Sequence, residues 1–114
     1  MAIMMTKVKN AIKKNLGNGI VFKLHNVSIN GEKRGCSGFV TNPANGVTVY
    51  LDTEPSCYAE TIYYRFAKDD KDFSGCRNRH TNKNNFEGFI GGICECLNMP
   101  EQYQRELVSF RKVG

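Results

Sequence analysis

The stretch IVFKLHNVSINGEKRGCSGFVTNPANGVTVYL, residues 20 to 51, decides the fold. Apolar and polar residues alternate along Ile20–Ile29 and again along Val47–Leu51, as they do in strands that bury one face. The segments between these runs, Asn30-Gly31 and Asn42–Gly46, carry the residues of tight turns. Glu32–Val40 is expected to be the middle strand of three. The stretch therefore predicts an antiparallel meander.

A fourth strand is predicted further along the chain. In Thr61–Phe66, the side chains of Ile62, Tyr64 and Phe66 share one face, and Tyr63 and Arg65 share the other. The second strand contains two glycines, Gly35 and Gly38. They indicate a β-bulge or a close approach of another backbone.

Three segments have the apolar spacing of helices. The first is Lys7–Leu16, with Thr6 as its cap, and the second runs from a cap at Asn84 or Asn85 to Leu97. The second is expected to bury Cys94 and to turn Cys96 elsewhere, and its glycines would permit close approach to a sheet. Pro100 can open a third helix, whereas Leu107–Val113 fits a helix or a short strand equally well. The sequence thus predicts one α+β domain, residues 1–114: a four-stranded antiparallel meander with an N-terminal helix and one or two C-terminal helices over one face.

The net charge of +5 lies in the first quarter of the chain. Residues 1–31 contain five lysines and no acidic residue, and the remainder holds 11 basic and 11 acidic residues. A basic end favours nucleic acid or an acidic protein surface, although a solubilising helix face explains it equally well. The candidate contact residues on this helix are Lys7, Lys9, Lys13 and Lys14.

The setting expected from the sequence is the cytoplasm. No apolar run approaches the ~20 residues that span a bilayer, so no membrane partner is expected, and the start of the chain lacks the pattern of a signal peptide. Five cysteines cannot all pair internally, and we expect them to be reduced and mostly buried.

The segment Tyr63–Lys83 concentrates aromatic rings, both signs of charge, a cysteine and a histidine. We expect a strand to Ala67 and then a long loop, Lys68–Lys83; loops of this length are usually functional or disordered. Arginines and exposed rings suit nucleic acid, and they suit a protein partner at least as well. The predicted partner-binding residues are Tyr63, Arg65, Lys68, Lys71, Arg77, Arg79, His80 and Lys83.

Two incomplete metal patterns lie in the same segment. Asp70–Gly75 is similar to the start of a calcium loop, but Thr81 stands where a bidentate Glu is expected. Cys76 and His80 have a spacing suitable for zinc, but Cys94 and Cys96 do not complete the set. A Cys76–His80 nucleophile pair lacks an orienting group and an oxyanion site. The sequence therefore predicts no metal, no cofactor and no catalysis.

Four short segments carry a resemblance to a class of proteins: Ser37–Val40, Val49–Glu54, Tyr64–Ala67 and Lys71–Gly75. Together they resemble small proteins encoded by phages and plasmids of Gram-positive bacteria, among them anti-CRISPR inhibitors of host defence. The resemblance implies a non-enzymatic protein that binds a nuclease or a ribonucleoprotein in the bacterial host cell, and it assigns no functional residue. A basic chain would not be a simple DNA mimic. The alternatives are a module that binds DNA or RNA directly and a metal- or thiol-dependent enzyme.

Overall fold

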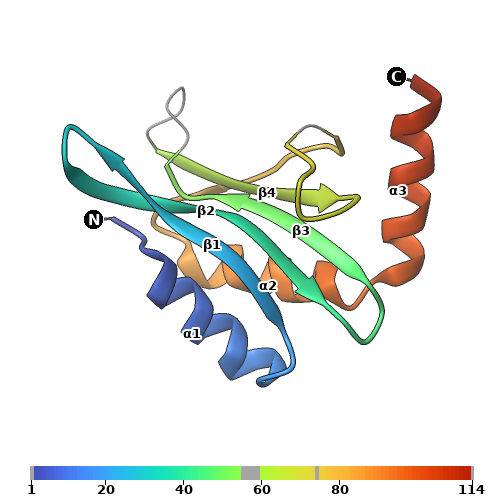
Figure 1. The fold of residues 1–114 in the computed structure, drawn as a ribbon, viewed down its shortest axis with the longest axis horizontal. Coiled ribbons are helices and arrows are strands. Elements are labelled where there is room, and N and C mark those ends of the chain that lie inside the picture. The colour runs from blue at the N-terminus through green and yellow to red at the C-terminus, as the bar shows by residue number, and fades with distance from the viewer. Residues whose placement is uncertain (1, 55–59, 74, 114) are drawn as a thin grey trace.

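The computed structural model describes residues 2–54, 60–73 and 75–113, the last four through their backbone alone. Figure 1 shows a twisted sheet with helices on one side of it and a third helix at its end. In chain order the elements are α1 (Met5–Leu16), β1 (Val21–Ile29), β2 (Glu32–Asn42), β3 (Val47–Asp52), β4 (Thr61–Ala67), β5 (Arg79–Asn82), α2 (Phe86–Leu97) and α3 (Pro100–Val113).

The strands form an antiparallel meander in the order β1-β2-β3-β4-β5. The turn between β1 and β2 has φ angles of 53° at Asn30 and 79° at Gly31. A type I′ turn requires positive φ at both central residues, so the predicted Asn-Gly hairpin is confirmed. Gly38, with φ of 138°, has no room for a side chain, because an added Cβ would collide with the backbone oxygen of Lys23. The predicted close backbone approach in the second strand is therefore also confirmed.

The sheet has five strands, and the prediction of four was wrong. The fifth, β5, lies inside the predicted loop Lys68–Lys83 and pairs with β4 from Tyr64↔Arg79 to Thr61↔Asn82. Its four residues are all polar, so no apolar alternation marks them as a strand. This strand forms because its backbone hydrogen-bonds to the edge of β4. The sequence pattern does not reveal such bonds.

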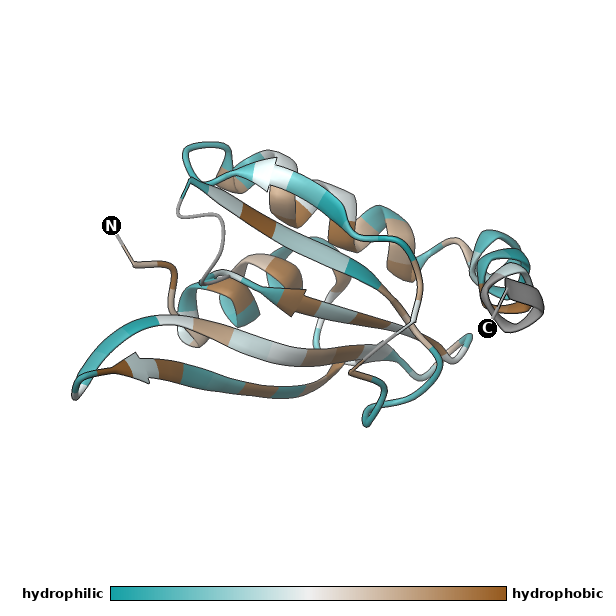
Figure 2. Ribbon diagram, turned by 90° about the horizontal axis from the view of Figure 1, so that it is seen from above, coloured by the Kyte–Doolittle hydropathy of each residue, from teal (hydrophilic) through white to brown (hydrophobic). Residues whose placement is uncertain are grey.

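The main core lies between the sheet and the helices α1 and α2. Figures 1 and 2 show both helices on the same side of the sheet, and bands of high and low hydropathy alternate along the strands. Ile62, Leu51 and Phe66 project from the sheet into this core and are fully buried. An added Cβ at Gly92 would collide with the Tyr64 hydroxyl, so α2 approaches the sheet as closely as its glycines predict. One covered face, as predicted, leaves the opposite face of the sheet free of helices.

The helix boundaries agree with the sequence in part. Asn85 caps α2 through its side chain, which accepts a hydrogen bond of 3.0 Å from the Gly88 amide. The predicted Thr6 cap is wrong: α1 begins at Met5, whose amide donates to Asn26 Oδ1 of β1 at 3.1 Å. A tertiary contact thus replaces a local cap. Residues 107–113 continue α3, which settles the alternative left open above.

Cys96 is buried, contrary to the prediction that it would turn away from the core. It lies on the flank of α2, where burial raises the pKa of its thiol to about 11 and the nearby positive charge of Arg79 acts in the opposite direction. The strand β5, which was not predicted, carries Arg79 and covers this flank of α2. No described helix is long and apolar enough to cross a membrane.

Candidate interaction surface on the open face of the sheet

The strand register gathers polar and aromatic side chains on the helix-free face of the sheet. Residues that pair directly across antiparallel strands project from the same face. One row therefore crosses all five strands and a second crosses four. The first row is His25, Ser37, Asp52, Tyr63 and His80. The second row is Lys23, Phe39, Tyr50 and Arg65.

An aromatic cluster fills the centre of this open face. The rings of Phe39 and Tyr50 are tilted against each other with centroids 5.1 Å apart, and the ring centroid of Tyr63 lies 6.2 Å from that of Tyr50. Phe73, from the loop between β4 and β5, sits edge-on to Phe39 at 5.2 Å and to Tyr50 at 6.0 Å. Phe39 and Tyr50 are buried, whereas Phe73 is 69% exposed. The cluster is thus a small second core with one ring left open to solvent.

Arg65 holds the loop against this cluster. Its guanidinium carbon lies 4.4 Å from the centre of the Tyr50 ring, and Nη1 donates to the Asp72 backbone oxygen at 3.3 Å. The residue is only 6% exposed. Arg65 was predicted to contact a partner, but it contacts the protein's own loop. It bonds to Asp72, the residue before Phe73, and so helps to fix the position of Phe73.

The first row forms a polar border beside the rings. Ser37 Oγ and His25 Nε2 are 3.1 Å apart, and the His80 ring lies 5.9 Å from that of Tyr63. Burial raises the pKa of Asp52, and burial together with the nearby Tyr50 and Asp52 raises the pKa of Tyr63 to about 12. The Tyr63 hydroxyl therefore stays protonated at neutral pH. Both histidines are exposed.

The acidic residues of the loop satisfy local groups and do not converge on one point. Asp72 Oδ2 accepts from the Lys68 amide at 3.0 Å, and Asp69 Oδ1 accepts from the Lys71 amide at 2.9 Å. The Asp70 carboxylate pairs with Lys23. These are the side-chain-to-backbone bonds of a polar turn. Ser74, one position of the calcium-like pattern, lies outside the described residues.

The thiols are placed as structural residues. Cys36, Cys76, Cys94 and Cys96 are free and buried, and Cys57 lies outside the described residues. Burial raises the pKa of the Cys76 thiol, whereas a nucleophilic cysteine needs a lowered pKa. The described part of the chain contains no group of three or more side chains suited to hold a metal ion.

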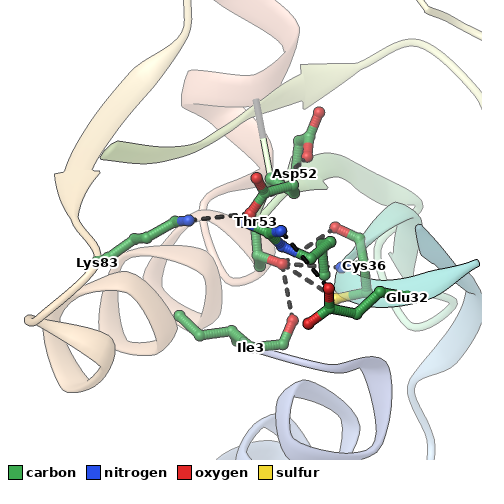
Figure 3. Close-up of polar contacts among 8 residues, drawn as sticks. Ile3, Glu32, Cys36, Asp52, Thr53 and Lys83 are labelled. Atoms are coloured by element: carbon green, nitrogen blue, oxygen red, sulfur yellow. Dashed lines mark hydrogen bonds and ion pairs between the residues drawn. The ribbon is translucent and has the colours of Figure 1, made fainter. Parts of the chain in front are cut away.

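Two other predicted contact residues are held in ion pairs on the opposite side of the sheet. Arg79 Nη2 lies 2.6 Å from Glu106 Oε2, and its guanidinium sits over the Phe66 ring at 4.8 Å. Lys83 Nζ lies 2.9 Å from Glu54 Oε2, at the end of the sheet drawn in Figure 3. Both cations fix the position of α3 or of the loop after β3.

The network in Figure 3 is centred on Thr53, which is fully buried. Its hydroxyl donates to the Ile3 backbone oxygen at 2.7 Å and accepts from the Cys36 amide at 2.8 Å. Gly35 leaves room for this side chain, because an added Cβ would lie 2.7 Å from Thr53 Oγ1. The network ties the start of the chain to β2 and β3, and its role is structural.

The predicted residues therefore fall into separate groups. Tyr63 and His80 lie together in the first row of the open face, and Lys68, Lys71 and Arg77 are exposed on the loop beside it. The basic helix lies on the opposite side of the sheet: Lys7 Nζ is 4.4 Å from the centre of the Phe86 ring. Sequence reasoning missed Phe73 and His25 as members of the open face, because only the register and the fold of the loop bring them there.

No family model, no curated protein and no solved structure matches this chain significantly.

Proposed function

We propose that this chain is a small non-catalytic binding protein whose open sheet face docks onto a partner protein. The observation that carries the proposal is the aromatic cluster: two buried rings support the exposed Phe73, with Tyr63 and His80 beside it. A rigid aromatic anchor with a polar border has the make-up of a binding hot spot.

A second observation supports surface recognition over a buried ligand site. Within the described residues, every buried side-chain nitrogen and oxygen already has a hydrogen-bond partner. Buried ligand sites usually keep a few polar groups directed at the ligand. The groups available on the open face are instead exposed rings and cations, which suit a broad contact with a macromolecule.

The proposed partner is a nucleic-acid-handling protein, such as a CRISPR–Cas nuclease or a ribonucleoprotein in the cytoplasm of a bacterial host. This part of the proposal rests on the resemblance to small phage and plasmid proteins. The mechanism would be occlusion of a working surface by direct binding, in the manner of anti-CRISPR inhibitors of mobile genetic elements. The basic charge of the chain fits a contact beside bound nucleic acid better than mimicry of DNA.

A pull-down and an activity assay test the proposal together. The tagged protein is incubated with nuclease-treated and untreated host lysate, and each captured nuclease is assayed for cleavage with added purified protein. We expect capture to survive nuclease treatment and cleavage to fall. Tyr63→Ala combined with Phe73→Ala should abolish both effects, whereas Val108→Ala, an exposed apolar residue on α3, should change neither. If the double variant captured the partner as well as the unmodified protein does, the open face would not be the docking surface.

Direct binding of single-stranded nucleic acid is the second candidate. The exposed rings of Phe73 and His80, together with the half-buried Tyr63 that packs against the aromatic cluster, could stack on bases. The exposed cations of the neighbouring loop, Lys68, Lys71 and Arg77, could contact the phosphates. A labelled oligonucleotide decides between the two. A direct binder loses affinity steeply between about 50 and 200 mM salt, whereas the protein-docking proposal expects little binding to bare nucleic acid at either concentration.

A further inference from the structure

The outer edge of β1 carries features of a docking site that differ from those of the open face. β1 ends the sheet, and within the described residues it pairs only with β2 along its nine residues. Alternate residues of such an edge strand direct their amide and carbonyl groups away from the sheet, where they can pair with another strand. The opposite edge, β5, offers only four residues.

The charged side chains of α1 and β1 themselves are all positive at neutral pH. Residues 1–31, which include all of α1 and β1, contain five lysines and no carboxylate side chain. The ammonium groups of Lys9 and Lys13 lie 5.8 and 5.9 Å from the centre of the Phe22 ring on β1, so they flank the edge on its helix side. No described carboxylate forms an ion pair with them; Lys23 on the open side is paired with Asp70.

Apolar side chains mark both ends of the same strand. Val21 is 49% exposed and Ile29 is 42% exposed, and they are two of the five large apolar side chains exposed in the described residues. They stand at the first and last positions of β1. An extended segment along the edge would cover both of them.

We propose that the β1 edge accepts an extended, acidic segment of a partner protein as a sixth strand. Backbone hydrogen bonds would supply affinity, as in other cases of strand addition, and the α1 lysines would select acidic side chains. A second copy of this chain is a poor occupant, because it would bring the same lysines against each other. The proposal rests on the proposed function only in assigning the segment to a protein partner, and it uses a different surface.

The test uses a fluorescein-labelled peptide of the length of β1, with Glu alternating with Val and Thr, and follows its anisotropy on titration with the full chain. We expect saturable binding that weakens at high salt. A peptide of the same sequence with every backbone amide N-methylated keeps the charge but cannot donate to the edge, so it should not bind. Lys9→Glu with Lys13→Glu should weaken binding at least about tenfold through charge reversal.

The charge-matched control is Arg77→Glu with Arg105→Glu, on exposed residues of the loop before β5 and of α3, neither of which belongs to α1 or β1. It should leave peptide binding within about twofold of the unmodified protein. Equal binding of the N-methylated peptide would overturn strand addition. Binding of a single-stranded oligonucleotide at the same lysines, with no binding of the peptide, would overturn the assignment to a protein segment. The peptide assay is independent of Phe73 and Tyr63, so it can fail without the open-face proposal failing.

Discussion

The guanidinium carbon of Arg65 lies 4.4 Å from the centre of the Tyr50 ring, within a face of the sheet that no helix covers. A cation in this position gains from the ring quadrupole, and more when it is desolvated. The same guanidinium donates to the Asp72 backbone, so one buried side chain joins the sheet to the loop that carries Phe73.

Replacing Arg65 should therefore loosen the loop and destabilise the fold. Arg65→Met keeps much of the buried volume but removes the contact with Tyr50 and leaves the Asp72 oxygen without this donor. We expect a loss of about 1–3 kcal/mol in the free energy of unfolding, measured by urea denaturation. Lys71→Met, on an exposed loop residue, is the control and should stay within about 0.5 kcal/mol of the parent protein. An unchanged midpoint for Arg65→Met would mean that the loop is held by other contacts.

The ion pair between Arg79 and Glu106 should make stability depend on pH. Burial acts to raise the pKa of Glu106, but hydrogen bonds from Arg79 and Gln102 outweigh it, and the pKa lies below the ordinary 4.5. A lowered pKa in the folded state means that this contribution is fully present above the unfolded pKa and is lost as pH falls through the folded value. Glu106→Gln should thus cost about 2 kcal/mol at pH 7.

The difference between Glu106→Gln and the parent protein should begin to shrink as the pH falls below 4.5 and should vanish below the lowered folded pKa of Glu106, because both proteins then carry a neutral side chain. Denaturant titrations at several pH values measure this convergence. Glu101→Gln is the control: Glu101 contacts Arg105 at 3.8 Å, but its side chain is almost fully exposed, so the substitution should have no measurable effect. A constant difference at every pH would assign the effect of Glu106→Gln to packing.

Much of this fold can be predicted from local sequence patterns. Alternation along β1, β3 and β4 and the Asn30-Gly31 turn depend on neighbouring residues only, and these predictions agree with the structure. The polar strand β5 depends on the edge of β4, and the start of α1 depends on the Asn26 side chain. Both partners are distant in the chain, so no local pattern reveals these two features.

The candidate surface was predictable only in part, for the same reason. Tyr63 and His80 were expected to contact a partner, and the register places them side by side in one row. The two ion pairs of Arg79 and Lys83 join residues 27 and 29 positions apart in the chain, which spacing along one strand cannot indicate. A basic residue in a polar segment can serve a partner or its own fold, and only tertiary contacts distinguish the two.

Two adjacent glycines in α2 should respond in opposite ways to alanine. An added Cβ at Gly92 would collide with the Tyr64 hydroxyl, whereas an added Cβ at Gly91 meets no atom within 4 Å. Gly92→Ala should therefore destabilise the protein by about 1–3 kcal/mol through overpacking. Gly91→Ala should stabilise it by up to about 1 kcal/mol, because alanine is the better helix former. Thermal unfolding of the pair measures both signs, and a stabilising Gly92→Ala would show that α2 can move away from β4.

The buried cysteines should react with thiol reagents only after unfolding. Burial raises the pKa of Cys36 and of Cys96 to about 11, and it raises the pKa values of Cys76 and Cys94 as well. The thiolate is the reactive form, so both access and ionisation oppose the reaction in the folded state.

The experiment uses a Cys57→Ser background, so that the signal comes from the four described cysteines alone. Release of thionitrobenzoate from Ellman's reagent at pH 8 should be at least about 100-fold slower in buffer than in concentrated urea, where the thiols are exposed and their pKa returns to about 8.5. Cys76→Ser should leave the slow native rate unchanged. A fast native phase that disappears in Cys76→Ser would contradict the structural role of this residue, and would instead indicate a reactive thiol beside the β5 strand that carries His80.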